Sequence, residues 1–304
     1  MSFEATPSTL LTRFCTKCGF AVDSSAAFCI HCGSSLIGRN IDREFGSFSF
    51  RSRWLFLIVI FAVLASLLNV YLMDIIMAGY VIFIVVRNKL SFGVLIGKIP
   101  STYNWWPLIL MVLGVLAYSL GASVVVMYPL AKLDSELVND IMNAVPLSES
   151  LASLFIPVVI LAPLIEEIVF RGLLFSRLMK KWGINVATVV SSLFFGLLHF
   201  PLNPIGAFLL GIVACVLYAR TRTLLVPIAL HAMNNMIAWV LMFTSGSDRM
   251  DFGSAEFLAQ YAFEGLIAMM LGAPIIFFFL GRWWPSRGTP IPYEANILVR
   301  SGKA

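Results

Sequence analysis

Two adjacent carboxylates, Glu166 and Glu167, interrupt an apolar stretch in the run LIEEIVFRGLL. Arg171 follows Glu167 by four residues, so a helix would place the two on one face, in the acid-first order that favours an ion pair. Glu166 is rotated by about 100° from Glu167 and has no local partner. Charged groups are expensive at membrane depth, so all three residues are candidates for function.

Two histidines and an asparagine supply groups that could work with these carboxylates. His199 ends the run FFGLLH, and His231 begins HAMNN, with Asn235 four residues later on the same helix face. This set suits hydrolysis. A buried carboxylate such as Glu166 is a stronger base toward water than an exposed one, and His199 could hold the same water. His231 and Asn235 could donate hydrogen bonds to the oxyanion of a tetrahedral intermediate.

The same polar residues are also compatible with three different roles. Their side chains could form hydrogen bonds that hold helices together. They could belong to a proton-coupled transporter, although the paired broken helices that mark many transporters are not evident. Glu166, His199 and His231 could also be three zinc ligands. The chain has no HExxH motif and asparagine is a poor zinc ligand, which favours a metal-free glutamate mechanism.

The first 38 residues have a different chemistry, because they hold four of the five cysteines as two CxxC pairs separated by ten residues. This spacing is typical of a structural zinc site with four thiolate ligands, Cys15, Cys18, Cys29 and Cys32. Gly19 and Gly33 follow the two pairs, where a tight turn favours glycine. Two disulfides are the alternative, but thiols stay reduced in a cytosolic location. His31 is expected to be a bystander, and Cys215 a packed apolar residue.

The composition beyond the head is that of an integral membrane protein. The chain is 60% hydrophobic and 12% charged, with a mean hydropathy of +0.91, whereas a soluble domain is about a quarter charged. The net charge of +5 is spread without a basic stripe, which argues against nucleic-acid binding. About eight apolar runs approach the length that a membrane span requires. They lie at 54–71, 73–87, 106–129, 153–174, 186–200, 204–219, 224–244 and 261–281.

Loop charges predict the orientation of these spans. Lys and Arg precede the first span and follow every second one thereafter, whereas the alternate loops 134–140 and 248–256 are acidic. Eight spans with both termini in the cytosol satisfy this pattern. The predicted organisation is a zinc ribbon at 1–38, a polar, basic linker at 39–53, a membrane core at 54–284 and a cytosolic tail at 285–304.

Three motifs, in this order on successive apolar runs, resemble a known family. They are EE-x-x-x-R at 166–171, F-x-x-x-H at 195–199 and H-x-x-x-N at 231–235. Together they are similar to the CPBP family, formerly the abortive-infection family, which includes CAAX prenyl proteases and bacteriocin-processing or immunity proteins. The resemblance covers roughly residues 150–245 and is weaker over 54–150.

The resemblance implies intramembrane endopeptidase activity, with Glu166 and His199 activating water, and His231 and Asn235 forming the oxyanion hole. It also implies that Glu167 and Arg171 shape the site. We therefore expect an all-α polytopic membrane protein with a small zinc ribbon. Zinc should be structural, with none required for catalysis. The bilayer and a membrane-associated protein or peptide are the expected partners, and a prokaryotic plasma membrane is the expected location. A silent immunity or scaffold protein is the first alternative, and a transporter the second.

Overall fold

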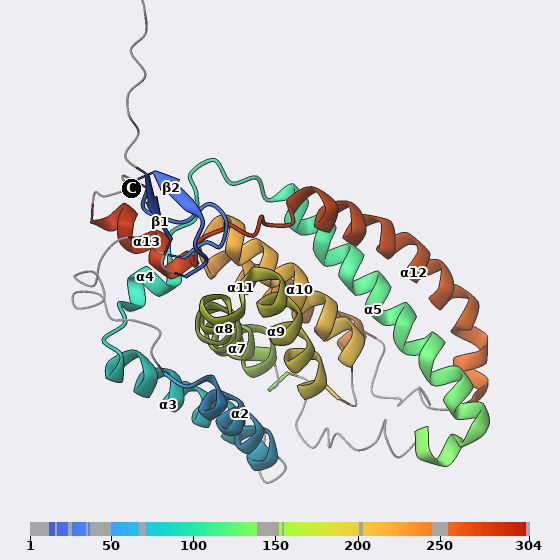
Figure 1. Ribbon diagram of the computed structural model, residues 1–304. Helices are drawn as coiled ribbons and strands as arrows, with labels where there is room; N and C mark the ends of the chain where they lie inside the picture. The colour runs from blue at the N-terminus through green and yellow to red at the C-terminus, as the bar shows by residue number, and fades with distance from the viewer. Residues whose placement is uncertain are drawn as a thin grey trace, which may run out of the picture.

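The structure is a computed structural model and describes residues 12–15, 17–23, 26–34, 36, 50–66, 71–138, 152–153, 155–200, 203–244 and 255–301. The described part is mainly helical, with one short antiparallel hairpin of β1 (Thr12–Phe14) and β2 (Ala21–Asp23) in the head. The helices run in three groups, with the hairpin at one end of the molecule (Figure 1).

Eight apolar helical segments lie in the described residues, in agreement with the expected number of spans. They are α2 (Ser52–Ser66), α3 (Tyr71–Arg87), α5 (Trp106–Leu133), the run η1–α7–η2–α8 (Ile156–Leu161, Ala162–Glu167, Ile168–Phe175, Ser176–Trp182), α9 (Ile184–Leu198), α10 (Pro204–Thr221), α11 (Leu225–Thr244) and α12 (Ala255–Trp283). By length and composition, three helices among the described residues could cross a membrane: Trp106–Leu133, Pro204–Thr221 and Glu256–Trp283. Helices α2, α3 and α9 are shorter, and the run from η1 to α8 changes helix type, so crossing by these segments would require local thinning of the bilayer or neighbouring helices.

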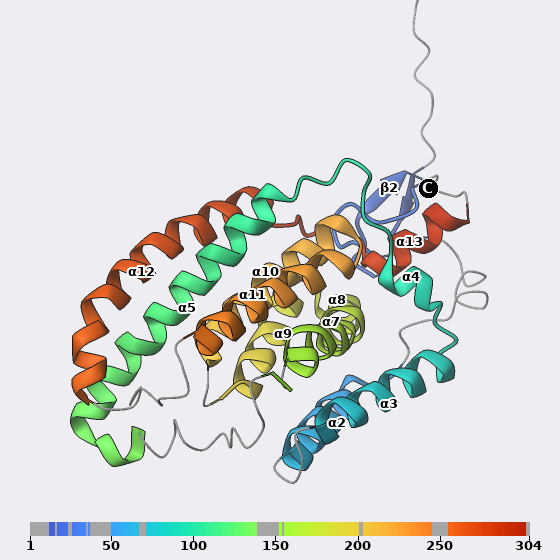
Figure 2. The same ribbon diagram turned by 180° about the vertical axis from the view of Figure 1, so that it is seen from behind.

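Two pairs of helices lie on either side of a central group of helices (Figure 2). Helices α5 and α12 pack along one flank, and α2 and α3 form a hairpin on the opposite flank. Glycines allow the α5–α12 backbones to approach closely, since a Cβ added at Gly121 would clash with the main chain at Gly265. Small residues at such contacts are characteristic of helix packing in lipid.

The centre is the helical run from Ile156 to Trp182, surrounded by α9, α10 and α11. Every residue of η2 is buried, which makes this segment the middle of the main hydrophobic core. Both η segments are π-helical, and Pro157 and Pro163 lie in or next to the first of them. Proline cannot donate the regular helical hydrogen bond, which favours such a departure, and π-helical turns occur often at functional sites.

The predicted tail contains a helix. Residues 292–300 form α13 (Pro292–Arg300), whose Asn296 side chain donates hydrogen bonds to the carbonyls of Val94 and Arg222. Val94 belongs to the short helix α4 (Phe92–Ile96). Tyr293 accepts a hydrogen bond from the main-chain N–H of Ser91 just before α4. The tail is therefore packed against the end of the helical core at which the head also lies (Figure 1).

Candidate functional site

Two carboxylates, one guanidinium and one imidazole form a buried network. Arg171 Nη1 donates a hydrogen bond of 2.7 Å to Glu167 Oε1, and the side chains are 1% and 0% exposed. Their spacing of four residues across the α7–η2 junction gives the pair that the sequence predicts. His231, from α11, adds a contact that the sequence does not reveal: its Nδ1–H donates to the same oxygen of Glu167 at 3.0 Å.

Glu166 points toward both intramembrane histidines. Its Oε2 atom lies 3.9 Å from Nε2 of His199 and 3.9 Å from Nε2 of His231. This distance is too long for a direct hydrogen bond, and Oε2 has no hydrogen-bond partner among the described residues although Glu166 is buried. The groups that lie nearest to Glu166 Oε2 therefore come from other helices, the end of α9 and α11, without a direct hydrogen bond.

Phe195 holds the orientation of the site. Its carbonyl accepts a hydrogen bond of 2.8 Å from His199 Nδ1, which leaves Nε2 of a neutral His199 as an acceptor toward Glu166. Its ring lies 4.4 Å from the His199 ring and 4.4 Å below the Arg171 guanidinium carbon. The Phe195 side chain is fully buried. The F-x-x-x-H spacing therefore lets one aromatic ring contact both the His199 imidazole and the Arg171 guanidinium.

Asn235 is placed differently from the other predicted site residues. It lies one helical turn after His231 on α11, and its Nδ2 donates to the carbonyl of Val158 in η1 at 2.9 Å. The structure thus brings together Glu166, Glu167, Arg171, His199 and His231, whereas the described contacts of Asn235 tie it to the first π-helical segment. An amide carries two N–H groups, so one remains for another acceptor.

Sequence reasoning missed one acidic residue near this site. Asp74 lies in the first turn of α3, and its half-buried side chain has an Oδ1 atom with no partner among the described residues. Helix α3, which carries Asp74, packs against α7, which carries Glu166. The available signal was a lone carboxylate inside the apolar run 73–87.

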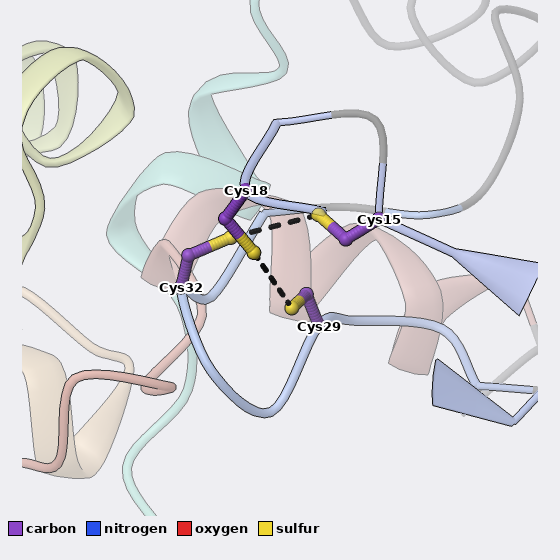
Figure 3. A group of neighbouring side chains, drawn as sticks. All are labelled: Cys15, Cys18, Cys29 and Cys32. Carbon is purple, nitrogen blue, oxygen red and sulfur yellow. Dashed lines mark hydrogen bonds between the residues drawn. The ribbon is translucent and has the colours of Figure 1, made fainter. Parts of the chain in front are cut away.

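The four cysteines of the head converge in space (Figure 3). All four Sγ atoms lie within 4.8 Å of one another, with Cys15–Cys32 at 3.7 Å and Cys18–Cys29 at 3.6 Å. A tetrahedral zinc–thiolate site places its sulfurs about 3.8 Å apart, so these residues fit a zinc ion. No disulfide joins them, and they are the one convergent set of metal ligands among the described residues.

Local geometry at this cluster provides the predicted turns and favours a thiolate at Cys15. Gly19 and Gly33 have φ values of +72° and +69°, as their places after each CxxC pair predict. Burial raises the pKa of the Cys15 thiol, but hydrogen bonds from the Ser34 hydroxyl and from main-chain N–H groups outweigh it and lower the pKa to about 6. His31 stacks on Phe20 at 5.0 Å, outside the cluster, as a bystander would.

The head also contacts the helical core. Lys17, between Cys15 and Cys18, donates a hydrogen bond of 2.8 Å to the carbonyl of Lys180 in α8. Gly33 approaches the main chain of Thr289 so closely that a Cβ would lie 2.5 Å from its carbonyl oxygen. The helical run that carries Glu166 therefore contacts, near its C-terminal end at Lys180, the loop between Cys15 and Cys18.

Comparisons with known proteins agree with both parts of the chain. Residues 148–237 match the family model described as type II CAAX prenyl endopeptidase Rce1-like, and residues 14–36 match a zinc-ribbon domain. The chain is 32% identical over 109 residues to the "Putative membrane peptidase YdiL" of Bacillus subtilis, which covers 36% of this chain and 42% of that protein. It is 38% identical over 84 residues to the "Membrane-embedded CAAX protease MroQ" of Staphylococcus aureus, which covers 25% of this chain and 34% of that protein.

These matches span less than half the length of the two curated relatives. No solved structure matches the chain. Glu166, Glu167, Arg171, His199, His231 and Asn235 all fall inside the matched range 148–237. The resemblance seen in the sequence is thereby confirmed: residues 148–237 of this membrane protein are similar to the Rce1-like type of CAAX protease domain, and residues 14–36, ahead of them, are similar to a zinc-ribbon domain.

Proposed function

We propose that the protein is an intramembrane endopeptidase that hydrolyses a peptide bond in a membrane-associated or lipidated protein or peptide. The observation that carries the proposal is the arrangement around Glu166, a buried carboxylate whose Oε2 atom has no partner in the described residues and faces two imidazoles at 3.9 Å. The match to the Rce1-like domain and to two bacterial membrane peptidases supports the reaction class.

In this proposal Glu166 is the general base and His199 positions the attacking water. Because His199 donates through Nδ1 to Phe195, its Nε2 accepts from the water while Glu166 Oε2 accepts the other proton. Both water protons are then held and an oxygen lone pair is free to attack the carbonyl carbon. Glu166 takes a proton as that bond forms and returns it to the leaving amine.

The oxyanion of the tetrahedral intermediate is stabilised by His231 and Asn235. Glu167 accepts from Nδ1 of His231, so Nε2 can donate only when His231 is an imidazolium. In that state Glu167 is its hydrogen-bonded counter-ion. Asn235 donates one N–H to Val158 and offers the second to the oxyanion.

Arg171 and Glu167 act through their neighbours. Arg171 holds Oε1 of Glu167 in place and lies over the Phe195 ring, so it supports the orientations of His231 and His199 together. Neither group reaches Oε2 of Glu166 in the described contacts. We therefore assign both of them to positioning.

We further propose that hydrolysis needs no metal and that zinc is structural. Cys15, Cys18, Cys29 and Cys32 fit one zinc ion and fill its tetrahedral coordination, which would supply folding energy to a head with almost no core of its own. At the site, Asn235 is a poor ligand for zinc. A bacterial plasma membrane, with both termini in the cytosol, is the proposed location, and the bilayer and the substrate are the proposed partners.

The test is proteolysis by the full chain and by Glu166→Gln in proteoliposomes and in cells. Glutamine keeps the volume and a hydrogen bond but removes the base, so the variant should fold while cleavage falls by about 10²–10⁴. Comparative proteomics of membranes containing the two forms would identify the substrates. Glu264→Gln is the matched control, because it neutralises an exposed carboxylate on α12.

Cleavage by Glu166→Gln at the wild-type rate would refute the assignment of the base. If neither form cleaves any membrane protein, a silent immunity or scaffold role accounts for the site better. Proton-coupled flux that is lost in Glu166→Gln without any cleavage would identify a transporter.

A further inference from the structure

Asp74 lies on the inward face of α3. Met77, Val81 and Ile84 follow it at helical spacing and are buried, whereas Ile75 and its neighbours on the other face are exposed. Helix α3 packs against α7 and η2, the segments that carry Glu166 and Arg171. Asp74 is thus turned toward the helical run of the site and not toward lipid.

The carboxylate of Asp74 has no compensating group in the described residues. Its Oδ1 atom is buried and without a hydrogen-bond partner there. The start of α3 provides partial stabilisation, because Asp74 lies in the first turn, where the helix dipole favours negative charge. A carboxylate at membrane depth still requires a partner to offset its desolvation.

The charges around the site are unbalanced toward the negative. Arg171 and His231 are both committed to Glu167. Glu166 is 6% exposed, and its Oε2 atom faces two imidazoles that are too distant for hydrogen bonds. Within the described part of the chain the Oδ1 atom of Asp74 has no hydrogen-bond partner, and a basic side chain of the substrate would supply one.

We propose that Asp74 is a specificity-determining residue that binds a cationic side chain, lysine or arginine, close to the scissile bond of the substrate. This proposal rests on the proposed endopeptidase function. A neutral substrate leaves Asp74 unpaired in an apolar site, whereas a basic residue forms a charge-assisted hydrogen bond there. The preferred substrates are therefore membrane-associated peptides with a basic residue beside an apolar segment.

The experiment uses the full-length protein in proteoliposomes with a synthetic peptide library. Each peptide has an apolar core with one lysine at a different position, and each has a partner with norleucine in place of that lysine. Cleavage is read by mass spectrometry as the ratio of kcat/KM for the lysine and norleucine forms. One lysine position should be favoured by about 10- to 100-fold, mostly through KM, as expected for an ion pair of intermediate effective dielectric.

Asp74→Asn should reduce that ratio to near one. Asp74→Glu should retain part of the preference. Glu256→Gln is the control, because it neutralises an exposed acidic residue in the first turn of α12. Thermal melting of each variant checks that it folds. If Asp74→Asn does not fold, the test is the lysine-to-norleucine ratio of the wild type compared with that of Asp74→Glu. A wild-type ratio of about 10 or more that falls in part in Asp74→Glu supports the proposal, and an unchanged ratio contradicts it.

Two results separate the failure of this inference from that of the proposed function. A lysine-to-norleucine ratio near one, with cleavage abolished by Glu166→Gln, would overturn the role of Asp74 and keep the protease. A ratio that survives Asp74→Asn unchanged would do the same. Absence of cleavage, or cleavage unaffected by Glu166→Gln, would remove the proposed function and the substrate preference with it.

Discussion

The buried pair of Glu167 and Arg171 should make a large contribution to stability that appears only when one partner is lost. Arg171→Met removes the positive charge and keeps much of the volume. It strands Glu167, which is 0% exposed, with His231 as its one remaining partner in the described contacts. Breaking a buried ion pair from one side costs about 3–5 kcal/mol. Loss of the contact with the Phe195 ring adds about 1 kcal/mol.

The assay is thermal melting of the full chain in detergent. The two losses together come to about 4–6 kcal/mol, so if each kcal/mol shifts Tm by about 2–3 °C, Arg171→Met should melt about 8–18 °C below the wild type. Lys180→Ala is the control, because it removes a pair with Glu294 at 3.4 Å in which the lysine side chain is 37% exposed. Such surface pairs contribute less than about 1 kcal/mol.

A double variant distinguishes the charge from the packing. Arg171 Nε and Nη2 have no hydrogen-bond partner among the described residues, so the pair does not fully offset its own desolvation. Glu167→Gln combined with Arg171→Met should therefore regain most of the stability lost in the single variant. The reasoning is refuted if Arg171→Met melts like Lys180→Ala, or if the double variant is less stable than Arg171→Met alone.

Two remaining predictions concern metal and topology. The purified protein should carry one zinc ion per chain by elemental analysis, with none in Cys29→Ser and one still in His231→Gln. Two ions in the wild type, falling to one in His231→Gln, would instead indicate a metal bound by Glu166, His199 and His231. Reporter fusions after Asp140 and after Asp251 should report the outer side of the membrane, because those loops are acidic. A cytosolic signal at either position would contradict the eight-span topology.

Helical spacing and residue type made the centre of the site predictable. A separation of four residues fixes the Glu167–Arg171 pair and the ring contact between His199 and Phe195. An isolated carboxylate at membrane depth is costly in free energy, so Glu166, which has no local partner, was expected to face groups on other helices. The CxxC spacing likewise fixes the cysteine cluster, since each pair closes locally on a glycine turn.

Contacts between distant segments were not predictable in the same way. The hydrogen bond of Asn235 to Val158 depends on the packing of α11 against η1, and the bond of His231 to Glu167 depends on its packing against α7. No local sequence pattern predicts how α11 is aligned against η1 or α7. Asp74 escaped notice because a single acidic residue in an apolar run has no sequence partner to reveal which face it occupies.

The route of the chain connects the head to the site through one helical run. Lys17 is held between two zinc-ligand positions, and its ammonium group donates to the carbonyl of Lys180 near the C-terminal end of α8. Helix ends leave carbonyls unsatisfied and favour positive charge there, so this contact caps the run. The run continues without a break in helical structure from Trp182 back to Glu166. The loop between Cys15 and Cys18 therefore contacts the same helical run that carries Glu166.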